Sequence, residues 1–280
     1  MKLGLIAGSG DVPRLIAEDR KARGEDIFIV SIRGYEEDWQ KQYPREVCGI
    51  AETGKMINAL RAAGCNTISL IGNVRRPDFS KLKPDLKAIS LLPKVLKAAT
   101  RGDDALLRSL VAIFETEGFR VVGADELVES LKSQAGYYTN RRLTEQDRED
   151  IRVGFKVAGE IGRLDIGQGA VVARGIVLAV EAQEGTDEML RRVSKLPDDI
   201  RGDEENRFGV LLKRPKPIQE ARVDLPTIGP STVRLASEAG LSTITIVEGG
   251  ALLVDKQEII RLADMLGMSV VCVTAKGELP

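Results

Sequence analysis

"KLGLIAGSGDVPRLIAEDRKARG", residues 2–24, opens with a short apolar run, passes through a loop with glycines and continues with apolar side chains at helical spacing. The pattern predicts a buried strand, a tight loop and an amphipathic helix, in that order. Further apolar runs of strand length lie at 26–32, 67–73 and 119–124, with helical stretches between the strands. This alternation favours a mainly parallel sheet with helices on both faces, so we expect a Rossmann-like domain.

The length of 280 residues exceeds the usual size of one hydrophobic core and favours two domains. Apolar periodicity fades over residues 133–150, although Thr144 has the pattern of a helix N-cap there. We predict an amino-terminal Rossmann-like substrate-binding domain at 1–132, a linker at 133–150 and a carboxyl-terminal α/β catalytic domain at 151–280, with the site between the domains. In the second half, residues 169–182 predict a hairpin that bends at Arg174 and Gly175.

The charges are nearly balanced, with 41 basic and 42 acidic groups, which is not the composition of a nucleic-acid binder. Three well-separated cysteines argue against a disulfide framework or a thiolate metal cluster and fit a reducing cytoplasm. No segment has the length and apolarity of a signal peptide or membrane span. The chain has no histidine, so any acid, base or metal chemistry falls to carboxylates and lysines.

Two loops of the first half follow predicted strands and carry residues suited to a ligand. Gly8 and Gly10 lie in the first loop, where backbone N–H groups at a helix start can bind phosphate. Pro13 occupies the place of the third glycine of a dinucleotide fingerprint, so phosphate contact and a plain tight turn both remain open. Asn73 and Arg75 follow the strand at 67–73, either as ligand contacts or as part of an exposed loop.

Residues 80–107 combine lysines with leucine, isoleucine and valine. Such a stretch could line a groove for acyl chains, rest on an anionic membrane surface, or simply pack in the core. The sequence leaves these three interpretations open.

Polar residues also gather in the segment "KRPKPIQEARVDLPTIGP", residues 213–230. Asp224 precedes a turn that opens a helix near Gly229, where a carboxylate and a bound anion could share Mg²⁺. An ion pair between Arg222 and Asp224 would explain the same sequence pattern without any catalytic role. Glu181 ends an apolar strand, where a carboxylate needs either a partner or a metal.

Several of these stretches together resemble the LpxI family of UDP-2,3-diacylglucosamine pyrophosphatases. The resemblance covers nearly the whole chain and is carried by "LGLIAGSGDVP", "GNVRRPDF", "RGDDALL", "EIGRLDIGQGAVV", "VLAVEAQEGTDEMLRR", "RPKPIQEARVDLPTIG" and "ALLVD". It implies a metal-dependent hydrolase of lipid A biosynthesis that releases UMP and lipid X by attack of water at the α-phosphorus. It also implies two domains with substrate between them, a cytoplasmic location in a Gram-negative bacterium and transient contact with the inner membrane.

The family's essential aspartate lies in "DLPTIG", which places it at Asp224. We expect Asp224 to bind Mg²⁺ or Mn²⁺ or to orient water together with Glu181. The remaining expected site residues are Lys213, Gln219 and Arg222 for catalysis, and Gly8, Gly10, Asn73, Arg75, Thr227 and Gly229 for substrate binding. The expected partners are the acylated UDP-sugar and a second copy of the chain. An NAD(P)-dependent oxidoreductase and a non-catalytic nucleotide-binding regulator are the alternatives.

Overall fold

The computed structural model describes residues 2–75, 77–217 and 219–280. The chain divides into two compact units, and neither is a single continuous stretch. The first unit comprises the residues up to Glu129 together with Glu220–Asp224, and the second comprises Ser130–Gln219 and Leu225–Pro280. A five-residue piece from the second half of the chain, here named the crossing segment, is therefore part of the first unit.

The sheet of the first unit has five parallel strands in the order β3-β2-β1-β4-β5. Its strands are β1 (Leu3–Ala7), β2 (Ile27–Ile32), β3 (Arg45–Cys48), β4 (Thr67–Ile71) and β5 (Arg120–Val121). This order matches the first five strands of the Rossmann order 3-2-1-4-5-6, so the predicted fold class is confirmed. The short edge strand β3, with two charged residues followed by Val47 and Cys48, was not predicted.

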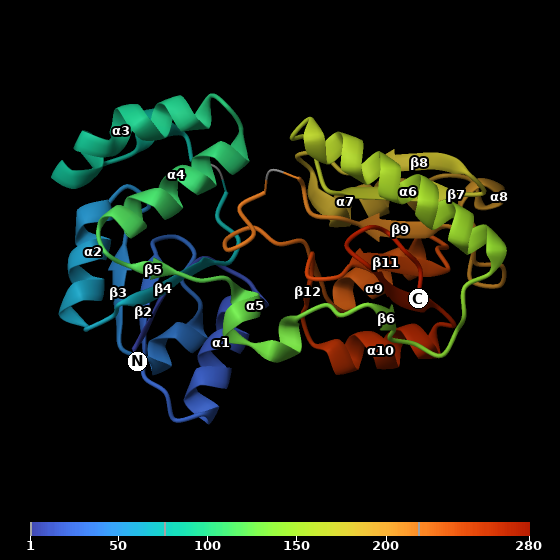
Figure 1. The fold of residues 1–280 in the computed structure, drawn as a ribbon, viewed down its shortest axis with the longest axis horizontal. Helices are drawn as coiled ribbons and strands as arrows, with labels where there is room; N and C mark the ends of the chain where they lie inside the picture. Colours follow the sequence, from blue (N-terminus) through green and yellow to red (C-terminus); the bar gives the residue numbers. More distant parts are fainter. Residues whose placement is uncertain (1, 76, 218) are drawn as a thin grey trace. The chain divides into compact units, whose positions relative to one another are not determined.

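Helices cover this sheet on both sides (Figure 1). They are α1 (Asp11–Ala22), α2 (Thr53–Ala62), α4 (Asp103–Thr116) and the short α5 (Ala124–Leu127), and α3 (Leu86–Ala99) lies outside α2 and α4. Leu60 of α2 and Phe114 of α4 share a core cluster with Val30 of β2. The next residue back along β2, Ile29, points to the opposite face and is also fully buried, where α1 contacts β2. Helix α3 packs against α2 and α4.

The second unit contains a mixed sheet of six strands in the order β6-β13-β11-β9-β7-β8. Its strands are β6 (Gly136–Tyr137), β7 (Gly169–Ala173), β8 (Ile176–Val180), β9 (Val210–Lys213), β11 (Thr243–Val247) and β13 (Ser269–Val273). Strands β9, β11 and β13 are parallel, and β7 and β8 form the predicted hairpin. Arg174 and Gly175 have φ angles of 51° and 80°, as a two-residue hairpin turn requires. Thr227–Ile228 (β10) and Leu252–Leu253 (β12) form a separate parallel pair.

Each face of this second sheet has its own core. The covering helices are α6 (Glu145–Arg163) on one face, and α7 (Gly185–Val193), α9 (Pro230–Glu238) and α10 (Lys256–Met265) on the other. Leu212 packs with Ile151 of α6, whereas its neighbour Leu211 packs with Leu190 of α7 and Val233 of α9. Short helical turns complete the fold: η1 (Asp38–Gln42), η2 (Phe79–Lys81), η3 (Glu129–Leu131) and α8 (Asp198–Arg201).

The segment 133–150, expected to be a linker, is instead an integral part of the second unit. Strand β6 pairs antiparallel with β13, and Thr144 caps α6 as predicted, its hydroxyl accepting the N–H of Asp147 at 3.1 Å. In turn, the Asp147 carboxylate accepts hydrogen bonds from the Thr144 backbone N–H at 2.8 Å and from the buried hydroxyl of Ser242 at 2.8 Å. The polar composition therefore reflects caps and buried hydrogen bonds.

No helix among the described residues is long and apolar enough to cross a membrane. All three cysteines are buried and free. Burial raises the pKa of Cys48 to about 11 and that of Cys272 to about 12, so these thiols resist ionisation near neutral pH.

Candidate functional site

The crossing segment is anchored to the first unit through the buried carboxylate of Asp104. Asp104 lies in the first turn of α4 and is 2% exposed. Its Oδ1 accepts the backbone N–H of Glu220 at 2.8 Å, and its Oδ2 lies 2.7 Å from a guanidinium nitrogen of Arg108. The positive end of the helix dipole favours a charged carboxylate at this place. Asp104 therefore holds the start of the crossing segment with a charge-assisted hydrogen bond.

A second anchor is Arg222, whose guanidinium contacts two carboxylates. Its Nε and Nη2 donate to the two carboxylate oxygens of Glu220 at 2.7 and 2.9 Å, and its Nη1 donates to Glu115 Oε1 at 2.6 Å. The hydrogen bonds that Arg222 donates to Glu220 raise the pKa of Arg222 and lower the pKa of Glu220. Arg222 was expected to act in catalysis, but its guanidinium faces two protein carboxylates that already balance its charge, so it is poorly placed to neutralise a phosphate.

The end of the crossing segment carries Asp224. The backbone N–H groups of Val223 and Asp224 both donate to the carbonyl of Glu220, at 3.0 and 3.1 Å, which closes a turn. The Val223 side chain packs against the core of the first unit. The Cβ that another residue would carry at Gly123 would lie 3.3 Å from the Arg222 Cα, so glycine permits this close approach. Asp224 itself is half-buried, which leaves its side chain open to solvent in part.

The loops after β1 and β4 meet at the carboxyl edge of the first sheet, as the sequence predicted. Ser9 and Asn73 exchange backbone hydrogen bonds at 2.8 and 3.1 Å. Gly8 is required by packing, since a Cβ there would lie 2.7 Å from the Asn73 carbonyl oxygen. The Arg75 backbone N–H donates to the Tyr35 hydroxyl at 3.0 Å, and the Arg75 side chain is exposed. Arg76 of the same loop lies outside the described residues.

Glu37 changes the interpretation of the glycine loop. Gly10 has a φ of 105° and precedes α1, but its N–H donates to Glu37 Oε1 at 3.0 Å. The other oxygen of Glu37 accepts the indole N–H of Trp39 at 2.6 Å. A carboxylate therefore lies where a dinucleotide pyrophosphate would approach the helix start, and like charges would repel. The geometry disfavours both phosphate binding at Gly10 and the NAD(P) alternative.

In the second unit, Lys213 and Thr227 are directly joined. Lys213 ends β9 and is 4% exposed, and its ammonium donates to the Thr227 carbonyl at 3.1 Å. Gly229 is the N-cap of α9, with Pro230 as the first helical residue. The Gly229 N–H donates to the Thr232 hydroxyl at 3.3 Å, so this expected phosphate donor has a partner within the helix. The predicted start of the helix at Gly229 is confirmed.

Glu181 lies just after β8, over Gly169 of the neighbouring strand. It is 6% exposed, and its Oε2 is buried without a hydrogen-bond partner among the described residues. A Cβ at Gly169 would lie 2.5 Å from this oxygen. Lys213 on β9 is directly opposite Gly169, so its side chain lies on the same face of the sheet as the Glu181 side chain. Gln219, from the same edge, donates its side-chain N–H to Gln168 Oε1 at 3.0 Å.

The predicted metal ligands Asp224 and Glu181 belong to different units, the first and the second respectively. No group of three or more carboxylates and thiols suited to a metal ion occurs among the described residues. Mg²⁺ commonly binds one or two protein carboxylates together with substrate phosphates. A magnesium site therefore does not require three ligands from the protein. Of the two predicted ligands, Glu181 has a buried carboxylate oxygen, Oε2, without a hydrogen-bond partner among the described residues.

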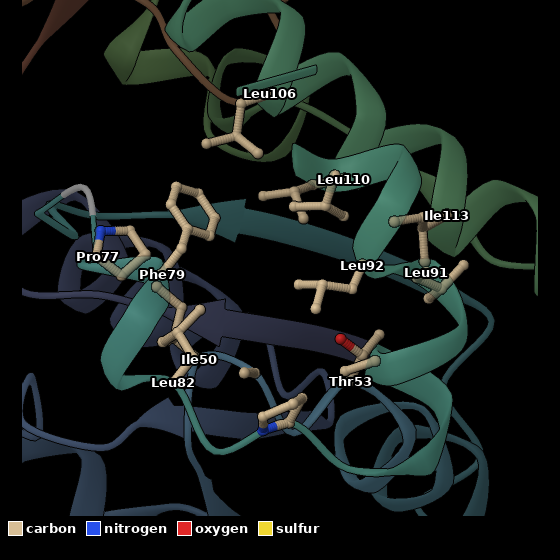
Figure 2. A pocket seen from close by; sticks show the side chains of 14 residues that line it. Ile50, Thr53, Pro77, Phe79, Leu82, Leu91, Leu92, Leu106, Leu110 and Ile113 are labelled. Atoms are coloured by element: carbon tan, nitrogen blue, oxygen red, sulfur yellow. The ribbon is translucent and has the colours of Figure 1, made fainter. Parts of the chain in front are cut away.

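An apolar pocket lies between α3, α4 and the segment around η2. Thirteen of the 14 residues that line it are apolar, with Thr53 as the exception. Figure 2 shows Phe79, Leu92, Leu106 and Leu110 gathered around the same space. Its composition suits a hydrocarbon ligand. The acyl-groove interpretation of residues 80–107 therefore has a concrete location. Leu96 of the same stretch is 39% exposed and is not among the residues that line the pocket.

Sequence reasoning missed three residues that shape the site: Asp104, Glu115 and Glu37. Asp104 reads as a helix-cap residue in "RGDD", and Glu115 lies on a charged helix face. The partner of Glu115 is 107 residues away and that of Asp104 is 116 residues away, so no local pattern announces either contact.

Comparisons with known proteins cover nearly all of the chain. A family model described as the LpxI N-terminal domain matches residues 2–131, and one described as the LpxI C-terminal domain matches residues 134–271. The chain is 49% identical over 269 residues to the UDP-2,3-diacylglucosamine pyrophosphatase LpxI of Caulobacter vibrioides, which covers 96% of each protein.

Proposed function

Since the chain belongs to the LpxI family, we propose that it hydrolyses the pyrophosphate bond of UDP-2,3-diacylglucosamine to UMP and lipid X in lipid A biosynthesis. The observation that carries the proposal is the 49% identity to a named UDP-2,3-diacylglucosamine pyrophosphatase over 96% of both chains. The apolar pocket of the first unit and the carboxylates of both units agree with a substrate that joins hydrocarbon chains to a diphosphate.

In the proposed reaction, Asp224 orients the water that attacks the α-phosphorus. Asp224 suits this role because its backbone is fixed by the anchored crossing segment while its side chain remains half-buried. A fixed carboxylate holds a water without the cost of ordering a mobile loop at each turnover. Arg222 contributes by positioning this segment, and its contacts are with Glu220 and Glu115.

Lys213 provides positive charge in the second unit. Its ammonium lies among buried groups of the sheet edge, where a cation interacts more strongly with phosphoryl oxygens than it would in water. The bond to the Thr227 carbonyl holds the ammonium in place. Gln219 and Gln168 form a neutral pair at the same edge, which can offer hydrogen bonds to the substrate.

A divalent cation, Mg²⁺ or Mn²⁺, is the cofactor that we propose. Glu181 supplies a buried carboxylate oxygen without a hydrogen-bond partner among the described residues, and Asp224 supplies a second carboxylate. When bound, such a cation neutralises charge on phosphoryl oxygens and so lowers the barrier to attack.

The apolar pocket holds an acyl chain of the substrate in this proposal. Leu92 of α3 and Leu106 and Leu110 of α4 provide its hydrocarbon walls. The proposal also places the enzyme in the cytoplasm of a Gram-negative bacterium, where it contacts the inner membrane transiently to obtain the acylated sugar.

The test is hydrolysis in ¹⁸O water. We expect purified protein with UDP-2,3-diacylglucosamine and Mg²⁺ to release lipid X and UMP that carries the label, because water attacks the α-phosphorus. Label in lipid X instead would move the attack to the other phosphorus. Absence of UMP with both Mg²⁺ and Mn²⁺, from protein that still binds the substrate tightly, would favour the non-catalytic nucleotide-binding alternative.

A further inference from the structure

Helix α3 presents apolar side chains on its outside as well as toward the pocket. Leu86 is 88% exposed, Ile89 52% and Leu96 39%, whereas Leu92 and Val95 line the pocket on the inner side. A helix at the surface of a soluble protein usually has a polar outer face. Helix α3 packs against α2 and α4 with its inner side, and its outer face is exposed.

The outer face is divided into an apolar stripe and a basic stripe. At about 100° per residue, Leu86, Ile89 and Leu96 fall on one side of the outer face, and Lys94 and Lys97 fall beside them. No acidic residue occurs within α3 (Leu86–Ala99). Lys87 forms an ion pair with Glu117 at 2.5 Å, but Lys83, Lys94 and Lys97 have no ion pair within the described part of the chain.

We propose that the outer face of α3 docks onto an anionic lipid bilayer. Apolar side chains beside lysines, on a helix too short and too charged to span, are typical of helices that lie in the membrane interface. Lysine stems can follow the apolar stripe while their ammonium groups contact lipid phosphates. The inference rests on the proposed function, because an enzyme for an acylated sugar must meet its substrate at a membrane.

Charge decides between a bilayer and a second copy of the chain. In a symmetric dimer through this face, the same patch would occur on both sides of the interface. The basic stripes of two copies would then approach each other without acidic residues in α3 to offset them. An anionic bilayer instead complements the lysines and accepts the apolar stripe.

The binding test uses vesicles and residues outside the pocket. We expect the parent protein to co-sediment with phosphatidylglycerol-containing vesicles at least tenfold better than with pure phosphatidylcholine vesicles, and less well at high salt. Leu86→Ser with Ile89→Ser, and separately Lys94→Gln with Lys97→Gln, should each reduce binding at least fivefold. The matched controls, Ile176→Ser and Lys276→Gln, alter exposed residues of the second unit and should leave binding unchanged.

Activity measurements separate this inference from the proposed function. With substrate presented in anionic vesicles, the α3 variants should lose activity at least fivefold, and with substrate dispersed in detergent they should match the parent. Parent protein that hydrolyses dispersed substrate but does not bind anionic vesicles would overturn the docking inference alone. Equal binding by parent and α3 variants would also overturn it, as would a concentration-dependent dimer that these substitutions abolish. If the parent releases no UMP from substrate in either form, the proposed function fails instead.

Discussion

Substitution of Asp104 by alanine should loosen the crossing segment without unfolding either unit. The change removes the acceptor of the Glu220 N–H, a bond of 2.8 Å to a carboxylate that is 2% exposed. A hydrogen bond to a charged group contributes about 1.5–3 kcal/mol. The remaining anchors, Arg222 and Val223, still hold the segment, so the expected effect is easier local opening.

The magnitude can be measured by amide hydrogen exchange at Val223 and Asp224. Both N–H groups are bonded to the Glu220 carbonyl and exchange when the segment opens. A loss of about 1.5–3 kcal/mol corresponds to an increase in exchange of about 10- to 150-fold. Exchange in β1 should not change, because this strand is paired on both sides, with β2 and β4.

Arg108→Gln is the matched control for this experiment. It removes the ion pair to Asp104 Oδ2 but keeps the Oδ1 acceptor, and the Arg108 side chain is 50% exposed. Solvent weakens such a pair to about 1 kcal/mol or less, so exchange should rise by no more than about fivefold. If Asp104→Ala raises exchange at Val223 and Asp224 by less than threefold, or no more than Arg108→Gln does, Asp104 does not anchor the segment.

Three further predictions concern chemistry, substrate binding and pH. Asp224→Asn should lower turnover by more than tenfold, about 1.4 kcal/mol in activation free energy. The control Asp199→Asn, on the exposed α8, should not lower it. An effect smaller than tenfold at Asp224 would contradict its central role. Leu92→Gln should raise KM for the diacylated substrate far more than for a deacylated analogue, and Leu92→Met should change neither; equal weakening of both ligands would count against the acyl pocket. Burial opposes ionisation of Asp147, but bonds from Thr144 and Ser242 and the charge of Arg141 outweigh it and hold the pKa below its usual value of 3.8. The stabilising contribution of Asp147 is therefore complete above about pH 4 and is lost as the pH falls through the lowered pKa. In urea unfolding, Asp147→Asn should be less stable than the parent at pH 6, and the difference should shrink as the pH falls below about 4. A stability difference that does not depend on pH would contradict this assignment.

The sequence predicted the elements whose signals are local. An apolar strand, a glycine loop and a helix could be assigned from residues 2–24, and the hairpin bend from Arg174 and Gly175, because period and turn chemistry act within a few residues. The helix starts at Thr144 and Gly229 were also recognisable. What could not be predicted depends on distant partners: the polar run at 133–150 satisfies groups such as Ser242, which lies 95 residues from Asp147.

The crossing segment is the clearest case of a site decided by distant partners. Spacing alone left open an ion pair between Arg222 and Asp224, and the structure instead directs Arg222 to Glu220 and Glu115. The contacts of Asp104 and Glu115 on α4, together with the packing of Val223 in the first core, join these five residues to the first unit. Local sequence patterns cannot predict which unit the segment joins, since the same residues would also fit an exposed loop.

Glu181 connects the energetics of the fold to the proposed chemistry. Burial of a carboxylate oxygen without a hydrogen bond costs about 1–3 kcal/mol or more for a charged group, which is a large part of the stability of a domain. Gly169 makes the arrangement possible, because any side chain there would collide with Glu181 Oε2. Lys213, opposite Gly169 on β9, has its side chain on the same face of the sheet, and its ammonium donates to the Thr227 carbonyl. A cation bound by Oε2 would remove the cost of burial, so this local instability is itself an argument for a divalent ion at Glu181.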